Sequence, residues 1–168
     1  TLNEPATALS ASISTSSDVV CFGESNGSAT VSALGGTPGY TYLWSNSQTG
    51  TDLTNVAAGV YTVEVTDLNS CTTTASVTIS EPALLTGTIS GTDISCAGAN
   101  DGEVSISVSG GTTPYYYAWS SGGTTDTETG LTGGTYTVTV TDDHGCSFSD
   151  NITITVPQPL SLNITSID

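Results

Sequence analysis

The chain has 168 residues, of which sixteen are acidic and none is Lys or Arg, so its formal net charge at pH 7 is −16. Binding to nucleic acid and attraction to anionic lipid both depend on cationic side chains. The composition therefore excludes nucleic acid as a partner. Because it also lacks an apolar run of about 18 residues, it excludes insertion into a membrane.

The sequence contains two copies of one pattern. Cys21 aligns with Cys96 and Cys71 with Cys146, at the same shift of 75 residues and without a gap. Matches at glycine, cysteine and aromatic positions indicate a repeated fold rather than a repeated composition. The other shared positions are Gly23, Gly27, Gly35, Gly36, Tyr40, Trp44, Gly59, Tyr61 and Asp67, which match Gly98, Gly102, Gly110, Gly111, Tyr115, Trp119, Gly134, Tyr136 and Asp142.

Both ends of the chain resemble parts of further copies. Glu4-Pro5 repeats Glu81-Pro82, and the run 160–168 repeats the run 85–93 that leads into the second copy. We therefore expect four segments. They are the end of a preceding repeat at 1–10, one repeat at 11–82, a second at 83–158, and the start of a following repeat at 159–168.

Within each copy, apolar and polar residues alternate in short segments separated by turn-forming residues, a pattern typical of β-strands. No segment has a helical period of useful length. In chain order, strands are predicted at 29–33, 40–44, 61–65 and 71–79, at 85–89, at 104–108, 115–119, 136–140 and 146–154, and at 160–164.

This pattern predicts an all-β fold made of two tandem immunoglobulin-like antiparallel β-sandwich modules, each with one disulfide. Trp44 and Trp119 lie between the two cysteines of their copies, as a tryptophan does in antibody domains. The tyrosine that antibody domains place two residues before the second cysteine is absent. We therefore predict the architecture and not membership of that family.

The cysteines predict disulfides, because a module of this size buries only about 60–65% of its unfolded surface and small secreted domains compensate with such bridges. Four cysteines allow three connectivities. Only Cys21–Cys71 with Cys96–Cys146 keeps the copies equivalent. A zinc site is the alternative, but it requires clustered ligands, whereas these cysteines are isolated.

The acidic residues make calcium the candidate cofactor, because hard cations bind carboxylate, amide and backbone carbonyl oxygens. Calcium at turns or between modules would relieve the repulsion among carboxylates that have no cationic partner. The alternative is a solvated acidic surface, since no EF-hand pattern is present. The candidate metal ligands are Asp67, Asn69, Asp142, Asp143, Glu24, Asn26 and Asp101.

One aromatic residue is a candidate for ligand binding. Tyr116 falls on the opposite face of its predicted strand from Tyr115 and Tyr117, because alternate residues of a strand share a face. Its ring could stack on a glycan, whereas the other aromatic residues are predicted to pack in the core.

No catalytic residue is assigned, and the protein is predicted not to be an enzyme. His144 beside Asp142 could suggest a Ser-His-Asp arrangement. The equivalent position in the first copy is Asn69, so His144 is predicted to be a turn residue.

The motif string of each copy resembles the SprB repeat. It consists of Cys-x-Gly-x-x-[Asn/Asp]-Gly, Gly-Gly-Thr with a following Tyr and Trp, Gly-[Val/Thr]-Tyr-Thr-Val, and Asp-x-x-[Ser/Gly]-Cys. These motifs occupy 21–27, 35–44, 59–63 and 67–71, and again 96–102, 110–119, 134–138 and 142–146. The resemblance covers nearly the whole chain, with one departure at Val156-Pro157, where the first copy has Glu81-Pro82.

Such repeats occur in very large secreted surface proteins of Bacteroidetes, including the mobile adhesin of gliding cells exported by the type IX secretion system. The resemblance implies an extracellular location on the bacterial cell surface. It also implies a stalk or spacer role, with neighbouring repeats of the same chain as partners. The alternative is an adhesive module that binds glycans or proteins, or that joins an extracellular filament through exposed strand edges.

Overall fold

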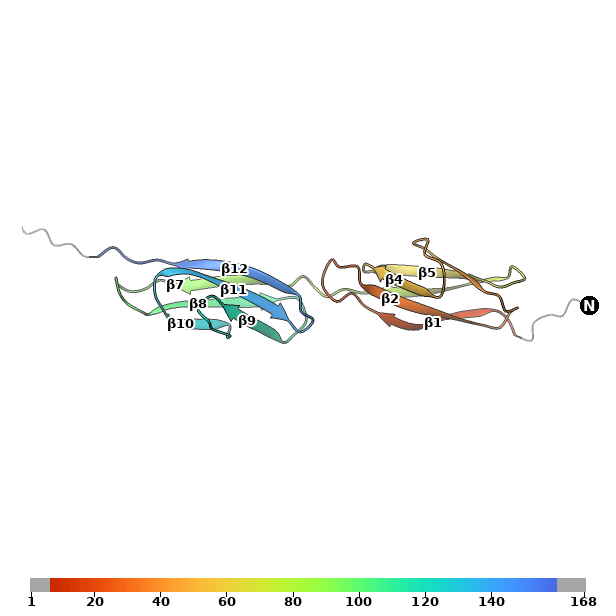
Figure 1. The fold of residues 1–168 in the computed structure, drawn as a ribbon, viewed down its shortest axis with the longest axis horizontal. Coiled ribbons are helices and arrows are strands. Elements are labelled where there is room, and N and C mark those ends of the chain that lie inside the picture. The colour runs from red at the N-terminus through yellow and green to blue at the C-terminus, as the bar shows by residue number, and fades with distance from the viewer. Residues whose placement is uncertain (1–6, 160–168) are drawn as a thin grey trace, which may run out of the picture. The chain divides into compact units, whose positions relative to one another are not determined.

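The computed structural model describes residues 7–159, which divide between two compact units, Thr1–Ala83 and Leu84–Asp168. The described residues of each unit form six strands (Figure 1). The first contains β1 (Ser10–Ser17), β2 (Gly27–Leu34), β3 (Thr41–Trp44), β4 (Asp52–Val56), β5 (Gly59–Thr66) and β6 (Thr72–Ile79). The second contains β7 (Thr86–Thr92), β8 (Gly102–Ser109), β9 (Tyr115–Trp119), β10 (Thr127–Leu131), β11 (Gly134–Asp142) and β12 (Ser147–Ile154). No membrane-spanning helix occurs in the described residues.

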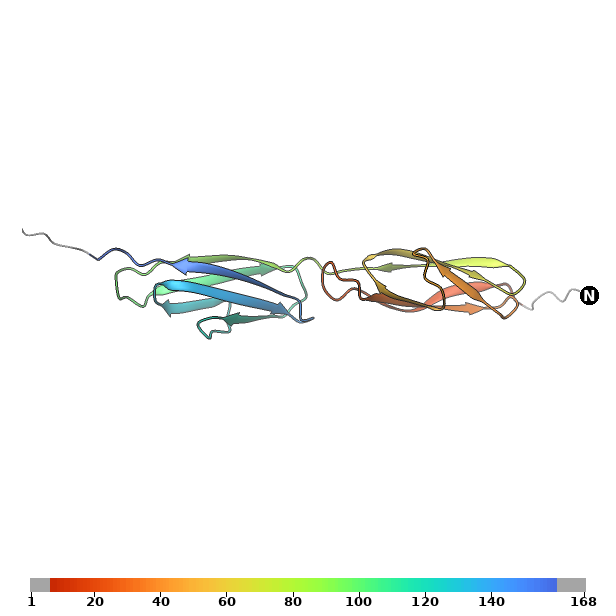
Figure 2. The same cartoon turned by 45° about the horizontal axis from the view of Figure 1, so that its top comes forward.

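The strands of each unit form two three-stranded antiparallel sheets that face each other (Figure 2). In the first unit the orders are β1-β2-β4 and β3-β5-β6, and in the second they are β7-β8-β10 and β9-β11-β12. Lettered in chain order with D omitted, these are sheets A-B-E and C-F-G of an immunoglobulin fold. The fold is therefore all-β with two immunoglobulin-like sandwiches, as the sequence predicts.

The core of each unit lies between its two sheets. Trp44 and Trp119 occupy the ends of β3 and β9 and are buried. Each indole N–H donates to a backbone carbonyl, of Gly50 at 3.1 Å and of Thr125 at 2.8 Å, so burying the ring leaves no polar atom unpaired. The other buried residues of the two core clusters are Val19, Ala29, Val31, Leu53, Val56, Val63, Val65 and Ile79 in one, and Ile94, Val104, Ile106, Leu131, Val138, Val140 and Ile154 in the other.

Both units have a tyrosine corner, in which a tyrosine near the start of strand F bonds through its hydroxyl to the backbone a few residues upstream. The sequence did not predict it, because no tyrosine lies two residues before the second cysteine. The hydroxyl of Tyr61, near the start of β5, donates to the carbonyl of Ala57 at 3.0 Å, and that of Tyr136 donates to Thr132 at 2.9 Å. Antibody domains place this tyrosine two residues before the cysteine of strand F. Val63 occupies that cysteine position here, so the tyrosine does not stand two residues before Cys71.

The strands β4 and β10 lack the alternation on which the strand predictions rest. In β4 the buried residues are Leu53 and Val56, three positions apart. The register against β2 shifts there, and Asn55 has φ +54°. Such a bulge changes the direction in which the following side chains point. The alternation of buried and exposed residues that predicts a strand is therefore absent from β4. The strand predicted at 160–164 lies outside the described residues.

The tyrosine corner supplies a first prediction. Replacing Tyr136 by Phe removes one hydrogen bond and leaves the ring, so the second unit should lose about 1 kcal/mol. Its Tm should fall by roughly 4–8 °C. Tyr116→Phe is the matched control because that ring is 58% exposed, and its effect should stay within about 0.5 kcal/mol. Equal Tm shifts for the two variants in calorimetry would contradict the assignment.

Candidate functional site

The shared polar residues gather at the end of each unit that carries the second cysteine. There the turn after β5 meets the glycine turn between β2 and β3. Asp67 is only 4% exposed, and its carboxylate accepts the backbone N–H groups of Thr37, Asn69 and Cys71, each at 2.9 Å. We call this arrangement the aspartate cradle.

The second unit repeats the cradle with the same geometry. Asp142 is 2% exposed and accepts the N–H groups of Thr112 at 2.8 Å and of His144 and Cys146 at 2.9 Å. A buried carboxylate is costly unless it is hydrogen-bonded. Three N–H donors meet that requirement, so the cradle needs no cation.

Glycine is required where the cradle touches the opposite turn. Gly36 and Gly111 have φ of +59° and +60°, a region that side chains other than glycine rarely adopt. A Cβ atom at either position would lie 2.7 Å from the carboxylate Oδ2 of Asp67 or Asp142. The Gly-Gly pair is therefore a turn whose backbone lies too close to the aspartate carboxylate for a side chain to fit.

A tyrosine and the residue at position 69 or 144 complete the arrangement. The hydroxyls of Tyr40 and Tyr115 donate to Gly35 and Gly110, both at 2.6 Å. These bonds hold the glycine turn from its other side.

Position 69 or 144 ties the hairpin to the threonine of the glycine turn. Asn69 Nδ2 donates to Thr37 Oγ1 at 2.8 Å, and the His144 ring contacts Thr112 Oγ1 at 3.3 Å. His144 is thus a turn residue equivalent to Asn69, as the repeat predicts. Asp142 accepts its backbone N–H.

The backbone donors lower the pKa of both cradle aspartates. For Asp67 the N–H of Thr37 has the largest effect, and burial opposes it in part. For Asp142 burial raises the pKa most strongly, but the N–H groups of Thr112, Cys146 and His144 outweigh it, and the pKa is lowered from 3.8. Both groups are therefore ionised well below neutral pH.

The other end of each unit carries the first cysteine and a second set of carboxylate and amide contacts. Asn26 Oδ1 accepts the N–H of Val20 at 3.0 Å, and Asp101 Oδ1 accepts that of Ser95, also at 3.0 Å. These bonds close the loop that holds the cysteine. The pKa of Asp101 is lowered, chiefly by the side chain of Ser95.

The predicted metal ligands are not gathered into one site. No group of three or more His, Cys, Asp or Glu side chains able to hold a metal lies within the described residues. The carboxylates of Asp67 and Asp142 face backbone N–H groups. The partial positive charge of these donors stabilises the carboxylate anion and disfavours a cation at the same place. Glu24 accepts the side-chain amide of Asn26 at 2.7 Å, and Asp143 is exposed. Calcium binding stays a prediction.

The predicted cysteine pairing is wrong in this structure. Cys21 is disulfide-bonded whereas Cys71 is a free, exposed thiol; in the second unit Cys146 is bonded and Cys96 is free and exposed. The pairs Cys21–Cys71 and Cys96–Cys146 are therefore not formed.

The reason is the length of the last strand. Cys71 directly precedes β6, whereas Cys21 lies beyond its far end, where Val19 donates to Ser80 at 2.9 Å and Gly23 to Glu81 at 2.7 Å. The eight residues of β6 span roughly 23 Å, but a disulfide requires Cα atoms within about 7 Å.

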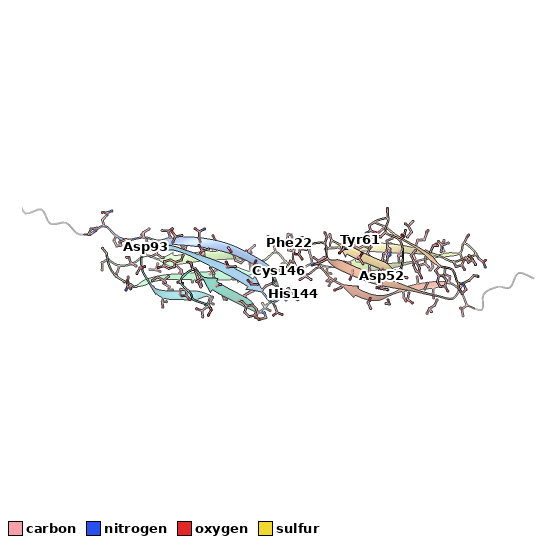
Figure 3. The ribbon with its side chains drawn as sticks, in the orientation of Figure 1. Phe22, Asp52, Tyr61, Asp93, His144 and Cys146 are labelled. Carbon is pink, nitrogen blue, oxygen red and sulfur yellow. The ribbon has the colours of Figure 1, made fainter. Side chains whose placement is uncertain are left out.

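The second unit has the same separation. Cys146 precedes β12, and beyond its far end Thr155 donates to Asp93, three residues before Cys96. Figure 3 shows Asp93 and Cys146 at opposite ends of this unit. The equivalence of the copies on which the prediction relied does not hold for their cysteines, because the bonded cysteine is the first in one unit and the second in the other.

Tyr116 is exposed, as its strand position predicts. Its partner across the sheet is Thr141 of β11. A ligand for Tyr116 stays a prediction.

The glycine of the cradle gives a second prediction. Gly111→Ala combines an unfavourable φ with contacts to Asp142 Oδ2 at 2.7 Å and to Leu85 Cδ1 at 2.9 Å. Gly145→Ala is the matched control, since Gly145 has φ +83° and nothing within 4 Å. The control should cost about 1 kcal/mol, and Gly111→Ala at least twice as much, because strain and displacement add. Denaturant unfolding measures both, and equal losses would show that the close approach is unimportant.

A third prediction concerns pH. Asp142→Asn replaces one acceptor oxygen with an amide that faces N–H donors, which should cost on the order of 2 kcal/mol at pH 7. Because the folded pKa is depressed, the carboxylate contributes fully above its unfolded pKa and loses that contribution as the pH falls through the folded value. The stability difference between the native chain and the variant should therefore shrink below about pH 4.

The neighbouring substitution Asp143→Asn makes the same change of formal charge at an exposed side chain. It should leave the unfolding free energy within about 0.5 kcal/mol at pH 7. Thermal melts between pH 7 and 2 compare the three chains. A loss for Asp142→Asn that does not vary with pH would contradict the role of the ionised carboxylate.

Comparison with solved structures finds distant similarities. A structure described as "Structural basis for Dscam isoform specificity" is 12% identical over 92% of this chain, with a TM-score of 0.40, and this chain spans 46% of it. The amphioxus IgVJ-C2 molecule is 14% identical over 72% of this chain and 91% of its own, with a TM-score of 0.35. The S-layer protein rSbsC(31-844) is 16% identical over 92% of this chain and 28% of its own, with a TM-score of 0.34. At these scores the similarities add nothing to the topology.

No curated protein matches the chain. The family model described as SprB repeat matches two regions, residues 13–49 and 88–124, one in each unit. Both matches include the first cysteine, the Gly-Gly turn and the tryptophan of their copy. Each unit therefore contains a region that matches the SprB repeat, as the motif string predicts.

Proposed function

We propose that the chain is a stalk or spacer segment of a large secreted bacterial adhesin, in which each repeat separates an adhesive region from the cell. The observation that carries this proposal is a contrast between the inside and the outside of the repeats. The residues that build the fold recur in both units at matched positions, whereas the exposed residues that could bind a ligand do not.

The recurring features are all structural. Both units have the aspartate cradle, the tyrosine corner, the buried tryptophan with its bonded indole N–H, and a cysteine at each end. A spacer requires this of its modules, because length then scales with the number of copies and each copy must fold in the same way.

The exposed features differ between the units. Tyr116 of β9 has Thr41 as its counterpart in β3. An open depression of about 400 Å³ on the outer face of β3 and β5 is lined in part by Leu43, Glu64 and Thr62. The second unit has Ala118 in place of Leu43 and Thr139 in place of Glu64. A binding function built on these side chains would not be shared by the repeats.

The charge of the chain is compatible with this role. Sixteen acidic residues without Lys or Arg keep such modules soluble and repel other acidic surfaces at short range. Export by the type IX secretion system, an extracellular location and a part in gliding motility belong to the same proposal. The chain is proposed to have no enzymatic activity.

The alternative function is an adhesive module, and the depression at Leu43 is the observation that favours it. An apolar side chain beside Glu64, Thr62 and Thr74 offers both a stacking surface and hydrogen-bonding groups, the combination that ligand sites use. Because only the first unit has these residues, binding would be confined to that unit.

The test is a binding experiment on the purified 168-residue chain. A spacer should show no saturable signal on a glycan array and should not reduce the adhesion of cells that display the full-length adhesin. Saturable glycan binding that is lost in Leu43→Ala or Glu64→Gln would instead establish the adhesive module. Tyr116→Ser is the corresponding variant in the second unit. If it alone abolished the signal, the second unit would be the binding unit.

A further inference from the structure

The outer face of the sheet β3-β5-β6 carries a carboxylate beside an exposed apolar side chain. Leu43, Glu64 and Thr74 lie opposite one another on the three strands, and all three are exposed. Residues paired in this way have Cβ atoms about 4.5–5.5 Å apart. The row therefore places an apolar side chain, a carboxylate and a hydroxyl next to one another across the sheet.

The open depression of about 400 Å³ on this face contains the row. Thr62 of β5 and two residues of the loop after β3, Ser45 and Ser47, also line it. Ser47 has φ +70°, whereas the matched residue of the second unit is Gly122, with φ +98°. A side chain held in this unfavourable conformation is a feature that binding sites often show, and here it lies at the edge of the depression.

The carboxylate of Glu64 has no hydrogen-bond or ion-pair partner among residues 7–159. At the positions that match Glu64 and Thr74, the hydroxyls of Thr139 and Ser149 are bonded to each other at 2.9 Å. Ala118 stands there in place of Leu43. The second unit therefore pairs these polar groups internally, whereas the first presents an unpaired acceptor beside an apolar side chain.

We propose that this depression binds a lysine side chain of a partner protein, with the ammonium on Glu64 and the alkyl stem on Leu43. A lysine combines an apolar four-carbon stem with a charged end, and the row from Leu43 to Glu64 complements both parts. Its ammonium has three N–H donors. The carboxylate of Glu64 and the hydroxyls of Thr62 and Thr74 supply three acceptors in the same depression.

The composition of the chain restricts what the occupant can be. A second copy of this chain cannot supply a lysine, because the sequence contains none. The net charge of −16 attracts basic surfaces and increases their rate of association at low ionic strength. The partner is therefore a different protein, with a lysine on a basic surface. This inference does not depend on the spacer role, since a spacer unit can also carry a contact for a partner.

A matched control lies on the outer face of the second unit. Glu103 of β8 is exposed and pairs with Thr92 on one side and Thr129 on the other. Its row therefore has a carboxylate between two threonines and no apolar side chain. Cation binding that requires only a surface carboxylate would occur at Glu103 as readily as at Glu64.

The test is an NMR titration of the nitrogen-15-labelled 168-residue chain with Nα-acetyl-lysine N-methylamide at low ionic strength. Amide signals around Glu64 should shift and saturate, with a Kd of roughly 1–10 mM. Glu64→Gln should weaken binding about fivefold, and Leu43→Ala should weaken it about threefold. Glu103→Gln should leave the Kd unchanged. All three side chains are exposed, and the amide spectrum of each variant shows that it is folded.

Two further ligands separate the contributions of the stem and the charge. Nα-acetyl-norleucine N-methylamide keeps the stem without the ammonium and should give no saturable shift, and glucosamine, which has an amine but no alkyl stem, should bind more weakly than the lysine ligand. Equal shifts around Glu64 and Glu103 would show unspecific attraction of a cation. Tighter binding of glucosamine would assign the depression to a glycan. Either result, or no saturable shift with the lysine ligand, would overturn the proposal and leave the spacer role untouched.

Discussion

A single buried carboxylate in each unit joins two chain segments that lie 30 residues apart, the glycine turn and the hairpin that ends with the second cysteine. The aspartate satisfies three backbone N–H groups from both segments, and the glycine opposite leaves room for it. In an immunoglobulin domain, the disulfide between strands B and F ties the two sheets together at the centre of the core. Here valine occupies that position in strand F, and a polar link at one end joins the strands instead.

This arrangement frees the cysteines from the core. Because the cradle closes the hairpin and Asn26 or Asp101 closes the opposite loop, neither end depends on a bond between the cysteines of its own unit. The two free thiols, Cys71 and Cys96, are exposed.

The repeat register and the alternation of apolar residues were sufficient to predict the sandwich and the buried tryptophans, because both depend on local periodicity. They also identified His144 as a turn residue, since Asn69 stands in its place. The strand β4 could not be predicted, because the bulge at Asn55 breaks the period. The cysteine pairing failed for a different reason: it depends on which end of a strand each residue reaches, and composition and spacing carry no information about that.

The candidate site shows the same division. The sequence singles out Asp67 and Asp142 as turn residues and candidate calcium ligands, from their carboxylates and the free carbonyls of the turns, and calcium binding stays a prediction. The signal for the cradle was available in the Gly-Gly-Thr turn and the Asp-x-x-x-Cys turn, which occur together in both copies. Their contact is tertiary, however, and becomes visible only when the strands that separate them are placed.

The ionised carboxylates of Asp67 and Asp142 are the central interaction of the two units. A carbon-13 NMR titration of the side-chain carboxyls of Asp67 and Asp142 measures this ionisation directly. If backbone N–H groups hold each carboxylate, both should titrate below the ordinary aspartate value of 3.8. Titration of either group at or above that value would show that burial outweighs the donors, and would contradict the cradle as the interaction that holds each repeat together.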